Sequence, residues 1–266
     1  MIASIRDTIL GQIVRDTEAL VASRKRDIKR SDLESMEGFE RVPLSLADAL
    51  RAKGLSIIAE AKKASPSKGV IRESFDPIKI AMAYQKAGAA AISMLTEPLH
   101  FQGSIDFLQL VRPELQIPLL RKDFIIDPFQ LLEARAYGAD AVLLIASCLE
   151  RPHLAELQEA ARELELSVLL ELYDPRELDR VDMDSTEIIG VNSRDLRTFE
   201  VDLDGALSVL GSLPSSIVRV AESGLRDVDD FVKVRDAEID AALVGEAFMI
   251  EDDPGAALER LKEELA

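Results

Sequence analysis

Short apolar runs alternate with amphipathic segments along most of the chain. Between several of the runs, apolar residues recur at helical spacing, for example over residues 76–88, 127–139 and 151–165. Several of these segments end in Gly-Ala or Gly-Ala-Asp, which is typical of a helix end followed by a strand. The strand-like runs occupy residues 55–63, 89–97, 117–125, 140–148, 166–174, 187–195, 217–225 and 240–248. The pattern therefore predicts eight strands with helices between them, except that the connection over residues 175–186 is short and its helix is doubtful.

Strands that alternate with helices pair in parallel, because a parallel pair needs a crossover connection. The runs are almost continuously apolar, as expected for strands that are covered on both faces. Eight such units favour an α/β fold closed into a (β/α)8 TIM barrel over an open sheet. The sequence also lacks the G-x-G-x-x-G and GK[ST] motifs that often follow the first strand of an open sheet.

The first fifty residues precede the first predicted strand. They predict one helix over about residues 3–23 and a second, charged segment. We expect residues 1–50 to form an N-terminal helical extension that packs on the barrel or covers its mouth. Residues 51–266 would form the catalytic barrel, and the two parts together would make a single domain.

The composition limits the classes of partner. The 266-residue chain carries a net charge of −17, so it should repel nucleic-acid phosphates and anionic membranes, and neither is an expected partner. The N-terminus shows no signal peptide and no apolar stretch near about 18 residues, so a cytoplasmic location is expected. A lone cysteine, Cys148, excludes a disulfide within the chain and is expected to be a small apolar residue.

Charged residues gather near the ends of the predicted strands. Because side chains alternate along a strand, Glu60 and Lys62 should share one face with Ile58, while Ala59 and Ala61 take the other. The same register places polar side chains late on other strands, at Lys122, Glu171, Asn192 and Glu222. All would meet at the C-terminal face of a barrel, where active sites of this architecture lie. Each charge alone also fits a structural ion pair, but two lysines and three carboxylates on one face favour acid–base chemistry.

The loops after the last two predicted strands suggest a phosphate site. Glycine lets a backbone approach a ligand closely, and exposed N–H groups at such turns bind phosphate. The candidates are Ser65, Lys68, Ser223, Gly224 and Gly245, although each glycine alone also fits an ordinary turn. The side chain of Glu246 would repel a phosphate, so only its backbone would contribute.

Other motifs that carry chemistry are absent from the sequence. His100 and His153 are its only histidines, share no motif with a nucleophile and are expected at the surface. The sequence has no G-x-S-x-G, no H-E-x-x-H and no Cys/His cluster. The lysines beside the carboxylates argue against a metal held by carboxylates alone, so no metal is expected.

Seven stretches, in order, resemble those of the indole-3-glycerol phosphate synthase family. They are AEAKKASPSKGVIRESFDP, SMLTEPLHFQGS, PLLRKDFIID, GADAVLLIAS, IIGVNSRDLRTFEVD, VAESGL and LVGEAFM, and the N-terminal extension fits as well. The resemblance implies a lyase of tryptophan biosynthesis that closes the indole ring. Its small phosphorylated substrate, 1-(2-carboxyphenylamino)-1-deoxyribulose 5-phosphate, would yield indole-3-glycerol phosphate, carbon dioxide and water. No cofactor or metal would be required, and we expect a monomer or a weak homo-oligomer.

The resemblance also implies catalytic roles at matching positions. Lys122 would be the general acid that protonates the carbonyl oxygen during ring closure, and Glu171 would carry a proton in the closing or dehydration steps. Lys62 would pair with the substrate carboxylate and could serve as a second acid. The supporting residues would be Glu60, Asn192, Glu222, Arg194 and Ser223.

Two further sets of residues would hold the two ends of the substrate, as the resemblance implies. An apolar wall around the anthranilate ring would consist of Phe101, Phe124 and Leu143. The phosphate grip would consist of Ser65, Gly224, Gly245 and Glu246.

Two alternatives stay open at this point. A phosphoribosyl isomerase on a phosphate-binding barrel predicts the phosphate loops, but it does not predict the set of lysines, glutamates and Asn192. A non-catalytic barrel that binds a phosphorylated metabolite predicts the loss of at least one central charge, and the sequence retains them all.

Overall fold

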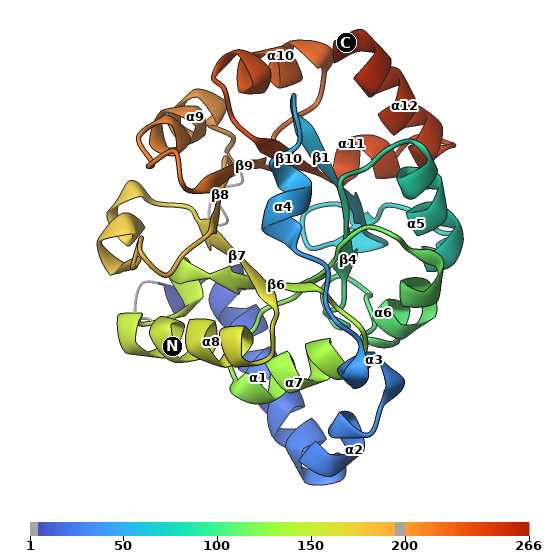
Figure 1. Ribbon diagram of the computed structural model, residues 1–266, viewed down its shortest axis with the longest axis vertical. Coiled ribbons are helices and arrows are strands. Elements are labelled where there is room, and N and C mark those ends of the chain that lie inside the picture. Colours follow the sequence, from blue (N-terminus) through green and yellow to red (C-terminus); the bar gives the residue numbers. More distant parts are fainter. Residues whose placement is uncertain (1–4, 195–199, 266) are drawn as a thin grey trace.

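A computed structural model of the chain describes residues 5–194 and 200–265. Within these ranges, eight parallel strands close into a barrel in the order β1-β10-β9-β8-β7-β6-β5-β4 (Figure 1). The strands are β1 (Ser56–Ala61), β4 (Ala91–Leu95), β5 (Leu119–Lys122), β6 (Ala141–Ile145), β7 (Ser167–Leu172), β8 (Ile188–Asn192), β9 (Val218–Glu222) and β10 (Ala241–Val244). The predicted TIM barrel is confirmed, with strands shorter than the apolar runs because the polar ends of the runs turn into loops.

Helices surround the barrel and connect most successive strands (Figure 1). They are α5 (Pro77–Lys86), α6 (Asp106–Val111), α7 (Pro128–Ala136), α8 (Arg151–Glu163), α9 (Leu203–Gly211), α10 (Val228–Asp236), α11 (Glu246–Met249) and α12 (Pro254–Leu265). The short connection between β7 and β8 holds a 3-10 helix, Pro175–Arg180, where an α-helix was doubtful. The loop after β1 carries a small antiparallel pair, β2 (Ala64–Ser65) and β3 (Gly69–Val70).

The limits of α5 and α7 follow from local sequence. The side chains of Asp76 and Asp127 accept backbone N–H groups of the first helical turn at 3.1 and 2.9 Å, and a proline follows each aspartate. Each helix stops before a glycine with positive φ, 82° at Gly88 and 88° at Gly138. These glycines turn the chain back toward β4 and β6.

Apolar side chains fill the barrel beneath the polar strand ends. Ile58, Leu120, Leu169 and Val220, each two residues before a charged site residue, have no exposed surface. Burial of each such side chain contributes about 1.5–3 kcal/mol. The strands are therefore apolar at their starts and polar at their ends, which places the chemistry at one end of the barrel.

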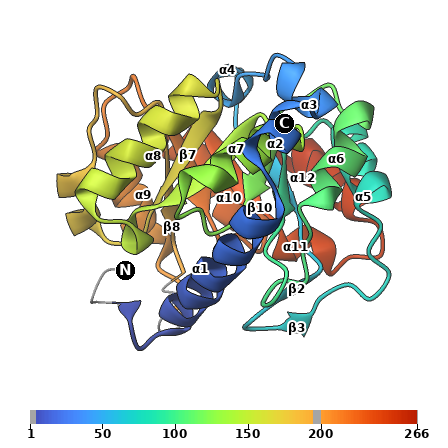
Figure 2. The same cartoon turned by 90° about the horizontal axis from the view of Figure 1, so that it is seen from below.

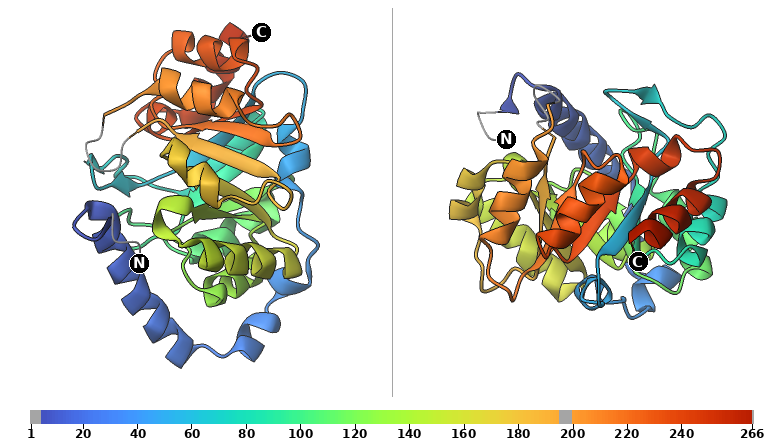
Figure 3. Two further views of the ribbon diagram at one scale, coloured as in Figure 1. Left: turned by 90° about the vertical axis from the view of Figure 1, so that its left-hand side faces the viewer. Right: turned by 90° about the horizontal axis from the view of Figure 1, so that it is seen from above.

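The segment before β1 touches both ends of the barrel. It contains α1 (Ile9–Asp27), α2 (Arg30–Glu34), α3 (Glu37–Glu40) and α4 (Leu46–Leu50). In Figure 3, α1 lies at the same end as β2 and β3, whereas α4 lies at the opposite end. The predicted limits of α1, about residues 3–23, were wrong: the helix begins after Thr8, whose hydroxyl accepts the N–H of Gly11 at 3.2 Å, and extends to Asp27.

A buried carboxylate, Asp140, fastens the N-terminal end of the barrel. It accepts the backbone N–H groups of Leu44 at 2.7 Å and of Leu119 at 2.8 Å. It also pairs with Arg41 at 2.5 Å and with Arg112. The carboxylate thus joins the chain before α4 to the starts of β5 and β6, opposite the polar strand ends.

Asp140→Asn should lower the free energy of unfolding by about 3–5 kcal/mol, because Arg112 would keep a buried charge without its partner. Urea unfolding at pH 7 measures the loss. Asp48→Asn is the matched control. The Asp48 side chain is 80% exposed, and its ion pair with Arg51 is long, at 3.8 Å. The control should change stability by less than about 1 kcal/mol, and equal losses in the two variants would contradict the assignment.

Candidate active site

A cavity of about 630 Å³ opens at the C-terminal end of the barrel. Every site residue predicted from the sequence lines it except Glu222. The predicted residues on its wall are Glu60, Lys62, Ser65, Phe101, Lys122, Phe124, Leu143, Glu171, Asn192, Arg194, Ser223, Gly224, Gly245 and Glu246. Glu222 lies behind this wall, with a side chain that is 1% exposed. The structure therefore brings together residues from loops and strands throughout the barrel.

Lys122 stands among three carboxylates. Its Nζ lies 3.6 Å from Glu60 Oε2, 3.6 Å from Glu171 Oε2 and 3.8 Å from Glu222 Oε2. The Nζ of Lys62 lies 2.8 Å from the other oxygen of Glu60, so Glu60 bridges the two ammonium groups. These five side chains form one charge cluster, built from the ends of β1, β5, β7 and β9.

Burial and charge oppose each other within the cluster. Burial lowers the pKa of Lys122, but attraction to Glu60, Glu171 and Glu222 outweighs burial and raises this pKa above its ordinary value. Burial raises the pKa of Glu60, but Lys62 and Lys122 outweigh it and lower this pKa. For Glu222, burial and repulsion from Glu171 act together and raise the pKa well above 4.5. The shared lysine thus lies between a carboxyl group whose pKa is lowered, Glu60, and one whose pKa is raised, Glu222.

Asn192 and Arg194 orient Glu171. The Nδ2 of Asn192 donates to Glu171 Oε1 at 3.3 Å, and the backbone N–H of Arg194 donates to Asn192 Oδ1 at 3.0 Å. The amide is thereby held with its donor toward the carboxylate. The rest of this sequence motif, residues 195–199, lies outside the described residues.

The predicted phosphate loops face the cavity beside the cluster. Ser223 and Gly224 both have positive φ, 64° and 74°. The carboxylate of Glu246 lies 3.6 Å from Lys68 and 3.6 Å from Arg194, so it bridges two cations across the cavity mouth. This side of the cavity therefore offers exposed turns and positive groups for an anion.

Gly245 has a second purpose that the sequence did not reveal. A Cβ at this position would lie 2.4 Å from Glu60 Oε1, inside van der Waals contact. The glycine therefore makes room for the carboxylate that bridges the two lysines.

Apolar side chains form another part of the wall. The rings of Phe101 and Phe124 lie 5.9 Å apart between centroids, with a tilt of 38°. The sequence analysis missed three further lining residues on α1, namely Ile9, Leu10 and Ile13. Their spacing on one helical face was the available signal, but it could not show what that face covers. Figure 2 shows α1 lying across this end of the barrel.

The two histidines are partly exposed, in agreement with their expected surface placement. The Nε2 of His100 lies 2.8 Å from Asp16 Oδ2, which ties the loop after β4 to α1. Cys148 is buried, as expected for a small apolar residue.

The described residues contain neither a cluster of metal-ligating side chains nor a membrane-spanning helix. Among residues 5–194 and 200–265, no group of three or more His, Cys, Asp or Glu side chains could hold a metal ion. In the same ranges, every helix is too short or too polar to cross a membrane.

Known proteins resemble this chain over nearly its whole length. The family model described as indole-3-glycerol phosphate synthase matches residues 10–261. An indole-3-glycerol phosphate synthase of Salinibacter ruber is 53% identical over 97% of this chain and 96% of its own length. That of Leptothrix cholodnii is 46% identical over 93% and 92%. The chain belongs to the indole-3-glycerol phosphate synthase family.

More distant solved structures share the fold with this family member. The 3-hexulose-6-phosphate synthase of Salmonella typhimurium aligns with a TM-score of 0.64 at 13% identity, covering 79% of this chain and 98% of that chain. Thiamine phosphate pyrophosphorylase of Pyrococcus furiosus aligns at 0.58 and 18% identity, covering 83% and 98%. At these identities the likeness shows the barrel alone.

In this family member, Glu222→Gln should become more stable relative to wild type as pH rises. The folded-state pKa of Glu222 lies above its ordinary value of 4.5, so its proton stabilises the fold fully below that value. This contribution is lost as pH rises through the folded-state pKa, whereas glutamine stays neutral. Thermal unfolding from pH 5 to pH 9 measures the difference in Tm. A difference that stays constant, or falls, over this range would contradict the raised pKa.

Proposed function

We propose that Lys122 is the general acid in the reaction of this chain. The family's reaction is the conversion of 1-(2-carboxyphenylamino)-1-deoxyribulose 5-phosphate to indole-3-glycerol phosphate, with loss of carbon dioxide and water. During ring closure an aromatic carbon attacks the ketone, and negative charge grows on the ketone oxygen. A buried ammonium supplies both a proton and a favourable field for that oxygen. The observation that carries the proposal is the position of Lys122 Nζ at the cavity, among three carboxylates that keep it charged.

Lys62 and Glu60 serve the substrate carboxylate and the proton transfers. The ammonium of Lys62 faces the cavity and neutralises the carboxylate that departs as carbon dioxide. Glu60 contacts both lysines, so it can move a proton between them. Glu171, held by Asn192, accepts and returns the protons that dehydration requires, and Glu222 supports it from behind.

The two ends of the substrate occupy opposite parts of the cavity. The anthranilate ring lies against Phe101, Phe124 and Leu143. The phosphate lies at Ser65, Gly224, Gly245 and the backbone of Glu246, with Arg194 and Ser223 alongside. Fixing both ends holds the aromatic carbon near the ketone and supplies proximity.

Three properties outside the site belong to the same proposal. The chain acts in the cytoplasm on a small phosphorylated substrate, without nucleic acid or membrane as partners, as the net charge of −17 supports. It works as a monomer or a weak homo-oligomer. Residues 1–50 and the barrel over residues 51–266 form one domain, as the contacts of α1 and α4 with opposite barrel ends support.

The direct test is turnover of the carboxyphenylamino deoxyribulose phosphate, followed by indole fluorescence with EDTA present. The chain contains no tryptophan, so background emission is low. Turnover supports the function and shows that added metal is not needed. A folded protein that binds this substrate without turnover would favour a non-catalytic barrel, and one that fails to bind it would favour an isomerase.

Lys122→Ala should lower kcat by roughly 10²–10⁴-fold, because ring closure loses its proton donor. Steady-state kinetics measures the loss, and circular dichroism checks the fold. Lys86→Ala is the matched control, since Lys86 is exposed on α5, and it should keep wild-type kinetics. A Lys122→Ala enzyme within a few-fold of wild type would exclude Lys122 as the principal acid.

Glu246→Gln should bind inorganic phosphate up to about fivefold more tightly than wild type. Its carboxylate competes with phosphate for Lys68 and Arg194, and partly exposed pairs of this kind are worth about 0.2–1 kcal/mol. Competitive inhibition of turnover by inorganic phosphate gives the affinity. Glu251→Gln provides the control, because Glu251 lines the same cavity but pairs with Arg260 outside it. Weaker phosphate inhibition in Glu246→Gln would place the phosphate elsewhere.

A further inference from the structure

The loop between β4 and α6 wraps around the buried carboxylate of Glu97. One oxygen accepts the N–H of Leu99 at 3.0 Å, and the other accepts those of His100 at 2.7 Å and Phe101 at 2.9 Å. Glu97 is 3% exposed. Among the described residues, no lysine, arginine or histidine forms an ion pair with it. Three backbone donors converging on one buried carboxylate make a strong, geometrically defined anchor. The last of these donors belongs to Phe101, whose ring lines the active-site cavity.

The loop adopts a conformation that needs such an anchor. Gln102 has a φ of 52°, which is unfavourable for a residue with a side chain. The next residue, Gly103, approaches strand β4 so closely that a Cβ would lie 2.4 Å from the carbonyl oxygen of Leu95. The N–H of Gly103 donates to the carbonyl oxygen of Glu97 at 2.8 Å, which closes the loop into a ring. Hydrogen bonds to Glu97 offset the strain and fix where Phe101 lies.

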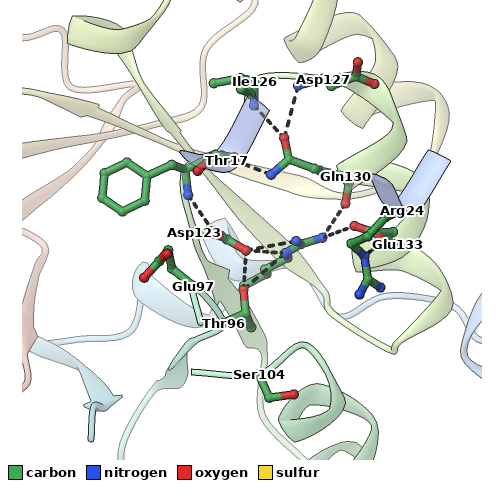
Figure 4. Close-up of polar contacts among 12 residues, drawn as sticks. Thr17, Arg24, Thr96, Glu97, Ser104, Asp123, Ile126, Asp127, Gln130 and Glu133 are labelled. Atoms are coloured by element: carbon green, nitrogen blue, oxygen red, sulfur yellow. Dashed lines mark hydrogen bonds and ion pairs between the residues drawn. The ribbon is translucent and has the colours of Figure 1, made fainter. Parts of the chain in front are cut away.

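A second buried carboxylate holds the other ring of the wall in the same way. Asp123 Oδ1 accepts the N–H of Phe124 at 2.9 Å. Its Oδ2 accepts from the hydroxyl of Thr96 at 2.5 Å and from Arg121 at 2.9 Å. Figure 4 shows Glu97, Thr96 and Asp123 near one another, and Asp123, unlike Glu97, also lines the cavity. Each phenylalanine of the wall is therefore positioned through its own backbone N–H by a carboxylate.

We propose that Glu97 is a positioning residue for the anthranilate end of the substrate, with Asp123 as its counterpart beneath Phe124. The inference rests on the proposed function, because that function places the anthranilate ring against these two phenylalanines. Glu97 does not itself line the cavity among the described residues, so it acts through Phe101. The ring contacts are the same before and during ring closure, so misplacing Phe101 weakens binding more than it slows the chemical step.

Glu97→Gln keeps the shape of the side chain but turns an amide NH₂ toward backbone donors. KM for the substrate should rise roughly tenfold, while kcat changes by less than about threefold. The inhibition constant of inorganic phosphate should stay as in wild type, because the proposed phosphate residues belong to the loops after β1, β9 and β10, whereas the carboxylate of Glu97 binds N–H groups of its own loop. Steady-state kinetics and phosphate inhibition of the purified full chain measure all three quantities.

Glu177→Gln is the matched control. Glu177 is 5% exposed and likewise accepts backbone N–H groups, those of Tyr173 at 2.8 Å and Asp174 at 3.2 Å, in the loop after β7. It contacts neither phenylalanine of the wall. Both variants should lower Tm, but only Glu97→Gln should raise KM.

The outcomes separate the inference from the function on which it depends. If wild type turns over the substrate and Glu97→Gln keeps the wild-type KM, or if both glutamine variants raise KM equally, Glu97 is a structural anchor only and the inference fails. If wild type itself shows no turnover, the proposed function fails first. If Glu97→Gln does not fold, Glu97→Asp decides the matter, because its shorter carboxylate keeps the charge but cannot reach all three N–H groups: a raised KM with unchanged phosphate inhibition supports positioning of the wall, and an unchanged KM overturns it.

Discussion

Lys122 of β5 lies close to three carboxylates, and the surrounding residues of the barrel mouth accommodate this charge cluster. Removing each ion from water costs several kcal/mol, so the cluster persists only because its members lie 2.8 to 3.8 Å apart. Neighbouring strands leave space for these side chains. A Cβ at Gly190 would lie 1.9 Å from Glu222, and one at Gly245 would lie 2.4 Å from Glu60. The glycines of β8 and of the loop after β10 are thus consequences of the charges they face.

Strand β5 carries charge on both of its faces. Lys122 points into the cavity, whereas Arg121 contacts Asp123 and, at 3.5 Å, Glu133 of α7 on the outer side. Glu133 pairs in turn with Arg24 of α1, as Figure 4 shows. A series of ion pairs therefore connects α1 to Arg121 and Asp123, the two residues that flank Lys122 in the chain. Through these ion pairs and through the lining residues Ile9 and Leu10, α1 becomes part of the site.

Periodicity in the sequence predicted the barrel, because alternating apolar runs and helices allow few other arrangements. It also predicted which charges meet, because the alternation of side chains along a strand sets the face that each one shares. The carboxylates that act through backbone atoms escaped prediction. Glu97 and Asp123 bind N–H groups of their own loops, and those bonds depend on backbone angles, such as that of Gln102, which periodicity does not encode. The contact of α1 residues with the cavity was not predicted for a related reason: a helical pattern shows which residues share a face but not what that face covers.

Two buried carboxylates, Asp140 and Glu222, lie at opposite ends of the barrel and differ in how completely they are hydrogen-bonded. Asp140 is paired with two backbone donors and two arginines. Glu222 is equally buried, yet neither of its oxygens has a hydrogen-bond partner among the described residues, and its pKa is raised. For Glu222, burial and the neighbouring carboxylate of Glu171 are what raise the pKa. In the described part of the chain, the carboxylate where the strands begin is therefore completely paired, whereas Glu222, where they end, is not.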